Sequence, residues 1–312
     1  MRAEMQSVLR EVEKAIVGKT AVIEKILLVL LAEGHVLLDD VPGVGKTTLA
    51  LALGRAIGLR CRRVQFTPDV LPSDIVGFST VDRETGSLRY QPGVVNDANL
   101  LLGDEINRTS SKTQSALLEA MEERQVTVDG QTYPLPRPFA VIATQNHVGA
   151  AGTQLLPYAQ LDRFMAQLTV GYPDREAQVA LLRDRQTGNP LDHVECALSR
   201  DDFLRIQDEI KLITVKDAIL DYIARLAMAS RDDPRIEVGI SPRGALFLNR
   251  MAKARAWSEG RDYVTGGDVQ TVFHDVCAHR VLLSRRGRME NAAVPAVLND
   301  LLTTVPVPDW GV

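Results

Sequence analysis

The sequence predicts an α/β fold in which a P-loop domain is followed by a small all-α domain. In the first half of the chain, short apolar runs bounded by polar or glycine residues alternate with segments of helical spacing. That alternation is typical of a parallel sheet covered on both faces. The stretch DDVPGVGKTT, residues 39–48, has the ending of a phosphate-binding loop. After Pro173 the strand-like runs stop and the periodicity is helical.

Five apolar runs predict a five-stranded parallel sheet flanked by helices. They cover residues 35–39, 62–66, 99–105, 139–144 and 166–170. Residues 20–33 are apolar almost all round, which predicts a buried helix. Helical spacing also covers 47–58 and 111–123, and we expect Ser111 to be the N-cap of the second of these helices.

Two segments predict hairpins inserted into this framework. Residues 79–93 alternate in the period of a strand on both sides of a turn signal at Glu84-Thr85-Gly86. Residues 124–136 do the same around Asp129-Gly130, a strong hairpin turn. Each segment is longer than a connecting loop needs to be.

Pro173 is the predicted domain boundary. Residues 1–173 form the α/β domain, including N-terminal helices, and residues 174–312 form the helical domain with a C-terminal tail. Helical spacing in the second part covers 174–187, 199–210, 214–230, 242–259 and 266–284. The tail from Arg286 onward gives no clear prediction.

Composition narrows the classes of function. The chain of 312 residues is 45% hydrophobic and 24% charged, which is typical of a soluble α/β protein. Its formal charge of −4 argues against a general nucleic-acid or membrane-surface role. The longest apolar run, 26–32, is too short to span a membrane. Three cysteines lie far apart in the sequence, which favours a reducing cytoplasm over a disulfide framework.

Residues 35–48 have the context that a P-loop requires, a strand followed by a tight turn and a helix. Backbone N–H groups at such a helix N-terminus converge on phosphate oxygens. Lys46 can reach the β- and γ-phosphates, and the Thr47 hydroxyl can bind Mg²⁺. The usual pattern has a glycine where this chain has Asp40, a short polar residue that tolerates an unusual φ. The candidate phosphate-binding residues are Pro42, Gly43, Val44, Gly45, Lys46, Thr47 and Thr48.

Two further strands end in polar residues that suit phosphate chemistry. In NLLLGDEINR, residues 99–108, Asp104 would hold Mg²⁺ through water. Glu105 would polarise the water that attacks the γ-phosphate, which predicts hydrolysis rather than binding alone. Asn146 follows the strand of FAVIATQN and could orient that water.

The ordered set of these motifs with AQLDRF (159–164) and SPR (241–243) resembles the AAA+ ATPases. The closer resemblance is to the MoxR family of AAA+ proteins. It is carried by QFTPDVLPSD (65–74), GDEINR (103–108), MEERQVTVDG (121–130), ATQN (143–146), LDRF (161–164) and HR (279–280), and it covers the chain from about Val17 to about Arg280.

The resemblance implies roles for further residues. Arg163 of LDRF would be an arginine finger that reaches the γ-phosphate in the neighbouring subunit. Arg243 would be the sensor-2 arginine of the helical lid domain, acting in its own subunit or in the neighbour. Val17-Gly18 and Tyr172-Pro173 would flank adenine. The two hairpins would correspond to the helix-2 insert and the pre-sensor-1 hairpin, facing a pore or a partner.

As a whole, the resemblance implies an ATP- and Mg²⁺-dependent ATPase that works as a ring, expected to be a hexamer, because a finger acting in trans leaves a monomer incomplete. Such proteins resemble chaperones that mature a protein client, commonly with a partner that has a von Willebrand factor A domain. Three alternatives stay open: a nucleic-acid motor, a metal-chelatase motor subunit, and a nucleotide-sensing scaffold with little turnover. The chain departs from the family pattern at Gln154, Leu156 and Tyr158 in GTQLLPYAQLDRF (152–164).

Overall fold

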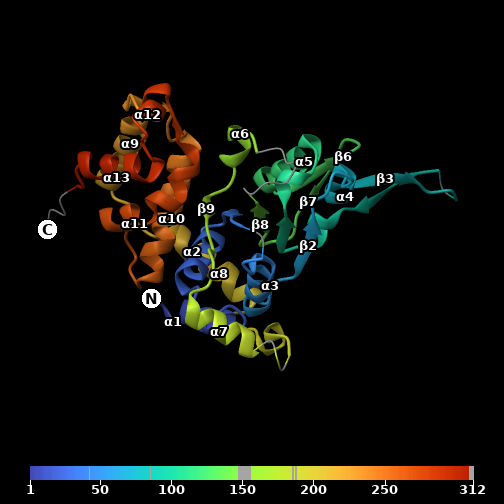
Figure 1. The fold of residues 1–312 in the computed structure, drawn as a ribbon. Coiled ribbons are helices and arrows are strands. Elements are labelled where there is room, and N and C mark those ends of the chain that lie inside the picture. Colours follow the sequence, from blue (N-terminus) through green and yellow to red (C-terminus); the bar gives the residue numbers. More distant parts are fainter. Residues whose placement is uncertain (42, 85, 147–155, 185, 187, 309–312) are drawn as a thin grey trace.

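A five-stranded parallel sheet forms the centre of the computed structural model, which describes residues 1–41, 43–84, 86–146, 156–184, 186 and 188–308 (Figure 1). Its strand order is β2-β5-β8-β1-β9, and every neighbouring pair is parallel. The strands are β1 (Val36–Asp39), β2 (Cys61–Gln65), β5 (Leu100–Asp104), β8 (Ala140–Gln145) and β9 (Ala166–Leu168). The five predicted strands are therefore confirmed, with bounds that differ by one or two residues.

Both faces of the sheet are buried. Successive side chains of each strand point to opposite sides, and those on each side belong to a buried apolar cluster. Val36 and Leu38 belong to one apolar cluster, and Leu37 belongs to the other. The first face is covered by α1 (Ala3–Glu13), α2 (Thr20–Leu31) and α3 (Lys46–Ala56), and the second by α4 (Pro72–Val76) and α5 (Ser111–Glu123). The N-cap of α5 is Ser110 rather than the predicted Ser111, because Ser110 Oγ accepts the backbone N–H of Thr113.

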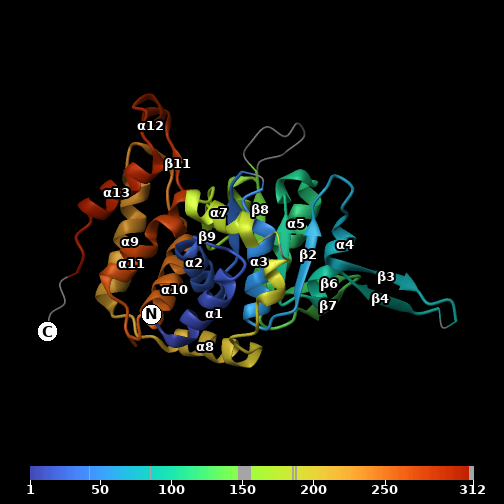
Figure 2. The same cartoon turned by 60° about the horizontal axis from the view of Figure 1, so that its bottom comes forward.

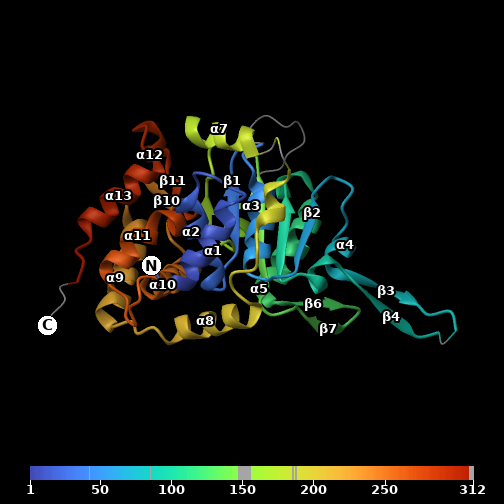
Figure 3. The same cartoon turned by 90° about the horizontal axis from the view of Figure 1, so that it is seen from below.

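Both predicted hairpins are present, and the first projects from the end of the molecule farthest from the C-terminal helices (Figure 3). It pairs β3 (Gly77–Val81) with β4 (Leu88–Pro92), and the second pairs β6 (Gln125–Val128) with β7 (Gln131–Pro134). Asp129 and Gly130 have φ of 50° and 78°, as the predicted turn requires. Of the other turn, Thr85 lies outside the described residues. Tyr90 and Tyr133 stack with ring centroids 3.9 Å apart and join the two hairpins.

Among the described residues after Pro173, the secondary structure is helical apart from one short strand pair. β10 (Ile236–Val238) and β11 (Leu282–Leu283) pair antiparallel, which corrects the prediction of purely helical structure. Strands of two and three residues are too short to show a period in the sequence. The helices are α7 (Arg175–Asp184), α8 (Arg200–Leu212), α9 (Asp217–Asp232), α10 (Pro242–Ser258), α11 (Gly266–Cys277), α12 (Arg285–Met289) and α13 (Val294–Thr304).

Short helices complete the described part of the chain: α6 (Tyr158–Leu161) and the 3₁₀ turns η1 (Val94–Asp97), η2 (Ile106–Arg108), η3 (Pro190–His193) and η4 (Ala278–Arg280). Among the C-terminal helices, α8 and α10 pack on α2, and α11 contacts the edge strand β9 directly (Figure 2). Gln207 of α8, for example, donates its Nε2–H to the Leu30 carbonyl at 2.8 Å. The two parts thus share one apolar cluster, and the division at Pro173 stays a prediction. Among the described helices, none combines the length and apolar character needed to cross a membrane.

Candidate functional site

The candidate nucleotide site lies at the carboxyl edge of the sheet, where all parallel strands end on the same side. β1 leads into the loop 40–45, β5 ends in Asp104, and β8 is followed by Asn146. A cleft at this edge brings together most of the predicted residues with three that were not predicted. Its lining is Gly43, Gly45, Lys46, Thr47, Thr48, Arg63, Gln65, Asp104, Glu105, Thr144 and Asn146.

The predicted phosphate loop has the backbone that phosphate binding needs. Gly43 and Gly45 have φ of 83° and 90°, values that L side chains rarely adopt. Lys46 begins α3, so the free N–H groups of an eleven-residue helix face the cleft. Val44 and Thr48 lie in the same turn and first helical turn, whereas Pro42 lies outside the described residues.

Lys46 crosses the cleft toward the neighbouring strand. Its Nζ donates to the Asp40 carbonyl at 2.8 Å and to Asn146 Oδ1 at 2.7 Å. Burial lowers the pKa of Lys46, although the negative charge of Asp40 opposes this effect. The ammonium group therefore lies where a phosphate would compensate a costly, partly desolvated charge.

Asp104 is 5% exposed and accepts three hydrogen bonds. Oδ2 accepts from Thr47 Oγ1 at 3.1 Å and from Arg63 Nε at 2.8 Å, and Oδ1 accepts from Thr144 Oγ1 at 3.2 Å. A hydroxyl and a carboxylate oxygen side by side are the hard ligands that Mg²⁺ prefers, so Thr47 and Asp104 fit that ion. No cluster of three or more His, Cys, Asp or Glu suited to a metal occurs in the described part of the chain. Nucleotide oxygens and water would have to complete the coordination.

Glu105 has a left-handed backbone, with φ of 57° and ψ of 48°. Such a conformation costs a non-glycine residue about 1–3 kcal/mol and is concentrated at functional sites. Glu105 Oε1 accepts from Asn146 Nδ2 at 2.9 Å. Oε2 accepts from Gln65 Nε2 at 3.0 Å and from Arg108 Nη1 at 2.7 Å. The predicted catalytic glutamate and the predicted Asn146 are thus direct partners.

Sequence reasoning missed Arg63, Gln65 and Thr144. Arg63 and Gln65 are two residues apart on β2, so they lie on the same face, and β2 runs parallel to β5, which carries Asp104. The available signal was two long polar side chains at alternate positions of a strand that ends beside the acidic pair. That signal has meaning only once β2 is known to be the neighbour of β5.

The segments expected to flank adenine lie beside the phosphate loop. A Cβ at Gly18 would lie 3.0 Å from that of Ala177 in the first turn of α7, and one at Gly45 would lie 3.7 Å from Ile16 Cδ1. Lys19 Nζ donates to the Tyr172 carbonyl at 2.8 Å. Val17-Gly18 and Tyr172-Pro173 are therefore brought together at the loop.

Asp40 does not have the unusual φ that its position suggested: its φ is not positive. Instead its carboxylate accepts the backbone N–H of Val41 at 2.7 Å and that of Gly171 at 2.5 Å. An ordinary backbone with a hydrogen-bonded side chain thus replaces the usual glycine.

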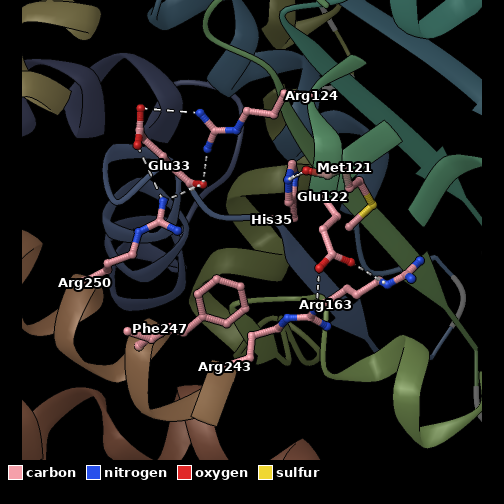
Figure 4. A pocket seen from close by; sticks show the side chains of 10 residues that line it. Glu33, His35, Met121, Glu122, Arg124, Arg163, Arg243, Phe247 and Arg250 are labelled. Carbon is pink, nitrogen blue, oxygen red and sulfur yellow. Dashed lines mark hydrogen bonds and ion pairs between the residues drawn. The ribbon is translucent and has the colours of Figure 1, made fainter. Parts of the chain in front are cut away.

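Arg163 and Arg243 lie at the opposite edge of the sheet. Arg163 precedes β9, which runs parallel to β1, so it lies at the amino end of the strands, as does His35. Arg163 Nε and Glu122 Oε2 are 3.1 Å apart, and Arg243 Nη2 donates to the other oxygen of Glu122. Figure 4 shows Glu122 between the two guanidinium groups. The described residues that line this pocket and the cleft around Lys46 have no member in common.

A buried ion pair fixes the two arginines relative to each other. Asp162 Oδ1 accepts from Arg280 Nε at 2.9 Å and from Ser241 Oγ at 2.8 Å. Arg280 is fully buried, and Ser241 is the N-cap of α10, whose second residue is Arg243. Breaking a buried pair on one side costs about 3–5 kcal/mol, because the other charge is left uncompensated. The loop of Arg163 and the helix of Arg243 are therefore firmly joined.

Tyr158, one of the three departures from the family pattern, contributes to the same junction. Its hydroxyl donates to the Arg280 carbonyl and lies 3.4 Å from the Gly239 carbonyl oxygen. Burial raises the pKa of Tyr158 to about 12, so the hydroxyl stays protonated and able to donate. Of the other two departures, Leu156 is buried and Gln154 lies outside the described residues.

His35 is one of the residues that line this pocket, and its ring is neutral. The backbone N–H of Val141 donates to its Nδ1 at 3.0 Å, so Nε2 carries the proton and donates to the Met121 carbonyl at 3.1 Å. Burial lowers the pKa of His35 to about 3, and the positive charge of Arg124 adds to the shift.

Two family models match the chain. The model described as "ATPase family associated with various cellular activities (AAA)" matches residues 35–166, and an "AAA lid domain" model matches residues 228–301. The first match ends at β9, and the second includes α10 and α11, so they support a nucleotide domain with a helical lid domain.

Similar proteins cover nearly the whole chain. An uncharacterized protein of Bacillus subtilis is 42% identical over 95% of this chain and 92% of its own. The chaperone MoxR1 of Mycobacterium tuberculosis is 38% identical over 96% of this chain and 81% of its own. The crystal structure of a putative ATPase from Cytophaga hutchinsonii is 36% identical, with a TM-score of 0.89 over 98% of this chain and 95% of that one.

Proposed function

Because the chain belongs to the MoxR family of AAA+ ATPases, we propose that it binds ATP with Mg²⁺ in the cleft around Lys46 and hydrolyses it in a ring of identical subunits. The observation that carries the proposal is the separation of two sets of residues. The phosphate loop and acidic pair lie at one edge of the sheet, and two arginines lie at the other. Neither set alone is a complete site for phosphoryl transfer.

In this proposal the cleft supplies binding and water activation. The N–H groups at the start of α3 and the ammonium of Lys46 bind the phosphates, with adenine between Val17-Gly18 and Pro173. Thr47 and Asp104 are the residues that would hold Mg²⁺, which shields phosphate charge. Glu105 takes the proton of the attacking water, and Asn146, 2.9 Å from it, orients its carboxylate.

The two arginines act on the nucleotide of the neighbouring subunit. Their pocket contains four arginines and two glutamates, so its charged lining has an excess of positive charge that suits an incoming phosphate. Glu122 holds Arg163 and Arg243 together before the neighbour docks. Since a guanidinium stabilises charge on the transferring phosphoryl group, a lone subunit turns over slowly. We expect the closed ring to be a hexamer.

The ring uses hydrolysis to remodel a protein client in the cytoplasm. A relative that is named as a chaperone supports this step. The two hairpins, joined by the Tyr90–Tyr133 stack, are the surface that would contact the client or a partner with a von Willebrand factor A domain.

Glu105→Gln tests the hydrolytic role. We expect ATP binding, measured by calorimetry, to be retained, and the ATPase rate to fall at least about 100-fold, as for loss of a general base. Glu123→Gln is the matched control, because Glu123 is an exposed glutamate of α5 outside the cleft, and it should keep the wild-type rate. Equal slow rates for the wild type and Glu105→Gln would instead indicate a nucleotide-sensing scaffold.

The same variant tests the client. Glu105→Gln with ATP should capture specific proteins that Lys46→Ala does not. ATPase stimulation by DNA, with salt-dependent DNA binding, would contradict the chaperone role and favour a nucleic-acid motor.

A further inference from the structure

Asp40 stands where the usual phosphate loop has a glycine, and its side chain contacts a segment outside that loop. It directly follows β1 and is 7% exposed. Its Oδ1 accepts the N–H of the next residue, and its Oδ2 accepts the N–H of Gly171, at 2.5 Å. Gly171 lies 131 residues later in the chain, just before Tyr172-Pro173. The carboxylate therefore ties the start of the loop to the segment that leads into α7.

Other contacts tie the same segment to the other side of the base position. Lys19 Nζ donates to the Tyr172 carbonyl. On the phosphate-loop side, Thr169 Oγ1 donates to the carbonyl of Asp39, the residue before Asp40, at 3.3 Å. Gly18 lies against Ala177 of α7. Segments 16–19 and 171–177 thus meet the phosphate loop, through Asp39, Asp40 and Gly45, around the position where a nucleotide base would follow its phosphates.

We propose that Asp40 is a positioning residue that holds the base-binding side of the site against the phosphate loop, so that the cleft recognises a whole nucleotide rather than its phosphates alone. The inference rests on the proposed function, since it takes the cleft to be a nucleotide site. Asp40 acts through Gly171 and the backbone around it, and it does not touch the phosphates.

Asp40 contacts the phosphate side of the site with its backbone and the base side with its carboxylate. Lys46 contacts the backbone carbonyl of Asp40, which any residue at this position supplies. The contact to Gly171 uses the carboxylate, which glycine lacks. Hydrogen bonds to a charged acceptor are stronger than neutral ones, and their loss would free the 171–173 segment. Asp40→Gly therefore restores the usual loop pattern and yet should harm nucleotide binding.

The test compares two ligands that differ in the base and sugar. Binding of ATP and of inorganic tripolyphosphate, each with Mg²⁺, is measured by calorimetry. For Asp40→Gly we expect ATP affinity to fall about tenfold and tripolyphosphate affinity to stay within about twofold. Asp40→Asn keeps one carbonyl acceptor and should lose less ATP affinity. It also carries the test if Asp40→Gly does not fold.

Two controls separate the inference from the proposed function. Lys46→Ala should weaken both ligands together, and Lys19→Met should weaken ATP selectively, because it removes the Tyr172 contact. The inference is overturned if Asp40→Gly and Asp40→Asn bind ATP as the wild type does, or if both ligands weaken equally. Failure of the wild type to bind either ligand would overturn the proposed nucleotide site itself.

Discussion

At the carboxyl edge of the sheet, side chains from several segments surround an open cleft, whereas at the amino edge Arg163 and Arg243 are already paired with one carboxylate. The first edge combines glycines of positive φ, a helix N-terminus and an acidic pair. The second has a single glutamate between two guanidinium groups that come from different parts of the chain. The carboxyl edge thus has an open cleft that can hold a ligand, and the amino edge has two guanidinium groups held by one carboxylate.

This difference teaches how the two parts of the chain are coupled. The lid helix α10 is joined to the loop of Arg163 because Ser241 and Arg280 both donate to Asp162, so we expect the lid of a subunit to move together with its own Arg163. Its Arg243 lies far from its own phosphate loop, at the opposite end of the strands. We therefore expect a change at one cleft to reach the neighbour's lid and finger as one body.

The largest expected effect tests whether the two arginines of the amino edge act on a nucleotide in their own subunit or in the neighbouring one. Arg163→Ala and Arg243→Ala should each lower the ATPase rate by about 10³-fold or more, because each removes charge stabilisation from the transition state. ATP binding to either variant should stay close to wild type. The ATPase rate and ATP affinity of each purified ring measure the two effects.

Co-assembly of the two arginine variants in equal amounts then separates the alternatives. If both arginines act on the neighbour, every interface lacks one of them and the mixture stays inactive. If Arg243 acted in its own subunit, about a quarter of randomly mixed interfaces would be complete, and activity would return to that extent. Arg163→Ala mixed with Lys46→Ala is the positive control, which should recover about a quarter of the wild-type rate.

A smaller effect is expected at the carboxyl edge. Lys46→Ala should weaken ATP binding by about 10- to 100-fold, because it removes a charged donor to the phosphates. It should also free Asn146, which now accepts from Lys46 and donates to Glu105. Calorimetry at neutral pH measures the affinity. Wild-type affinity in Lys46→Ala would contradict the assignment of this edge as the phosphate site.

The sequence predicted which motifs meet at the carboxyl edge, because most residues that line the cleft lie in contiguous motifs at strand ends. Gly43 to Thr47 and Asp104-Glu105 each follow one strand, and parallel strands must end together. Arg63 and Gln65 escaped because their role depends on strand order, which puts β2 beside β5. A pattern within one strand does not reveal which strand is its neighbour.

The amino edge was predictable only through the family resemblance. Nothing local in LDRF or SPR indicates that Arg163 and Arg243 meet at Glu122, since their contact depends on how α10 packs against the sheet domain. The role of Tyr158 was hidden for the same reason, because its partners lie 81 and 122 residues away. The strand pair β10–β11 was missed because its members are too short for periodicity.

The smallest predicted effect is a pH dependence of stability that comes from His35 at the amino edge. His35 is neutral in the folded protein, with a pKa of about 3, and titrates near its ordinary value of 6.5 in the unfolded chain. Between those values the unfolded chain binds more protons, so stability is lost as pH falls below 6.5. Protonation would remove the acceptor of the Val141 N–H, close to the positive charges of Arg124 and Arg250.

The partly buried His279 also has a lowered pKa, so the pH dependence of wild-type stability contains the contributions of both histidines. The His35→Gln variant isolates the contribution of His35. From pH 7.5 to 5.5, the free energy of unfolding should fall about 1 kcal/mol less in His35→Gln than in the wild type. Denaturant titrations at each pH measure that difference. Hydrogen exchange should show the acid-induced opening at residues 121–124 and 35–38 before it reaches 43–48. Equal pH slopes for the two proteins, or opening that begins at the phosphate loop, would contradict a pH-sensitive amino edge.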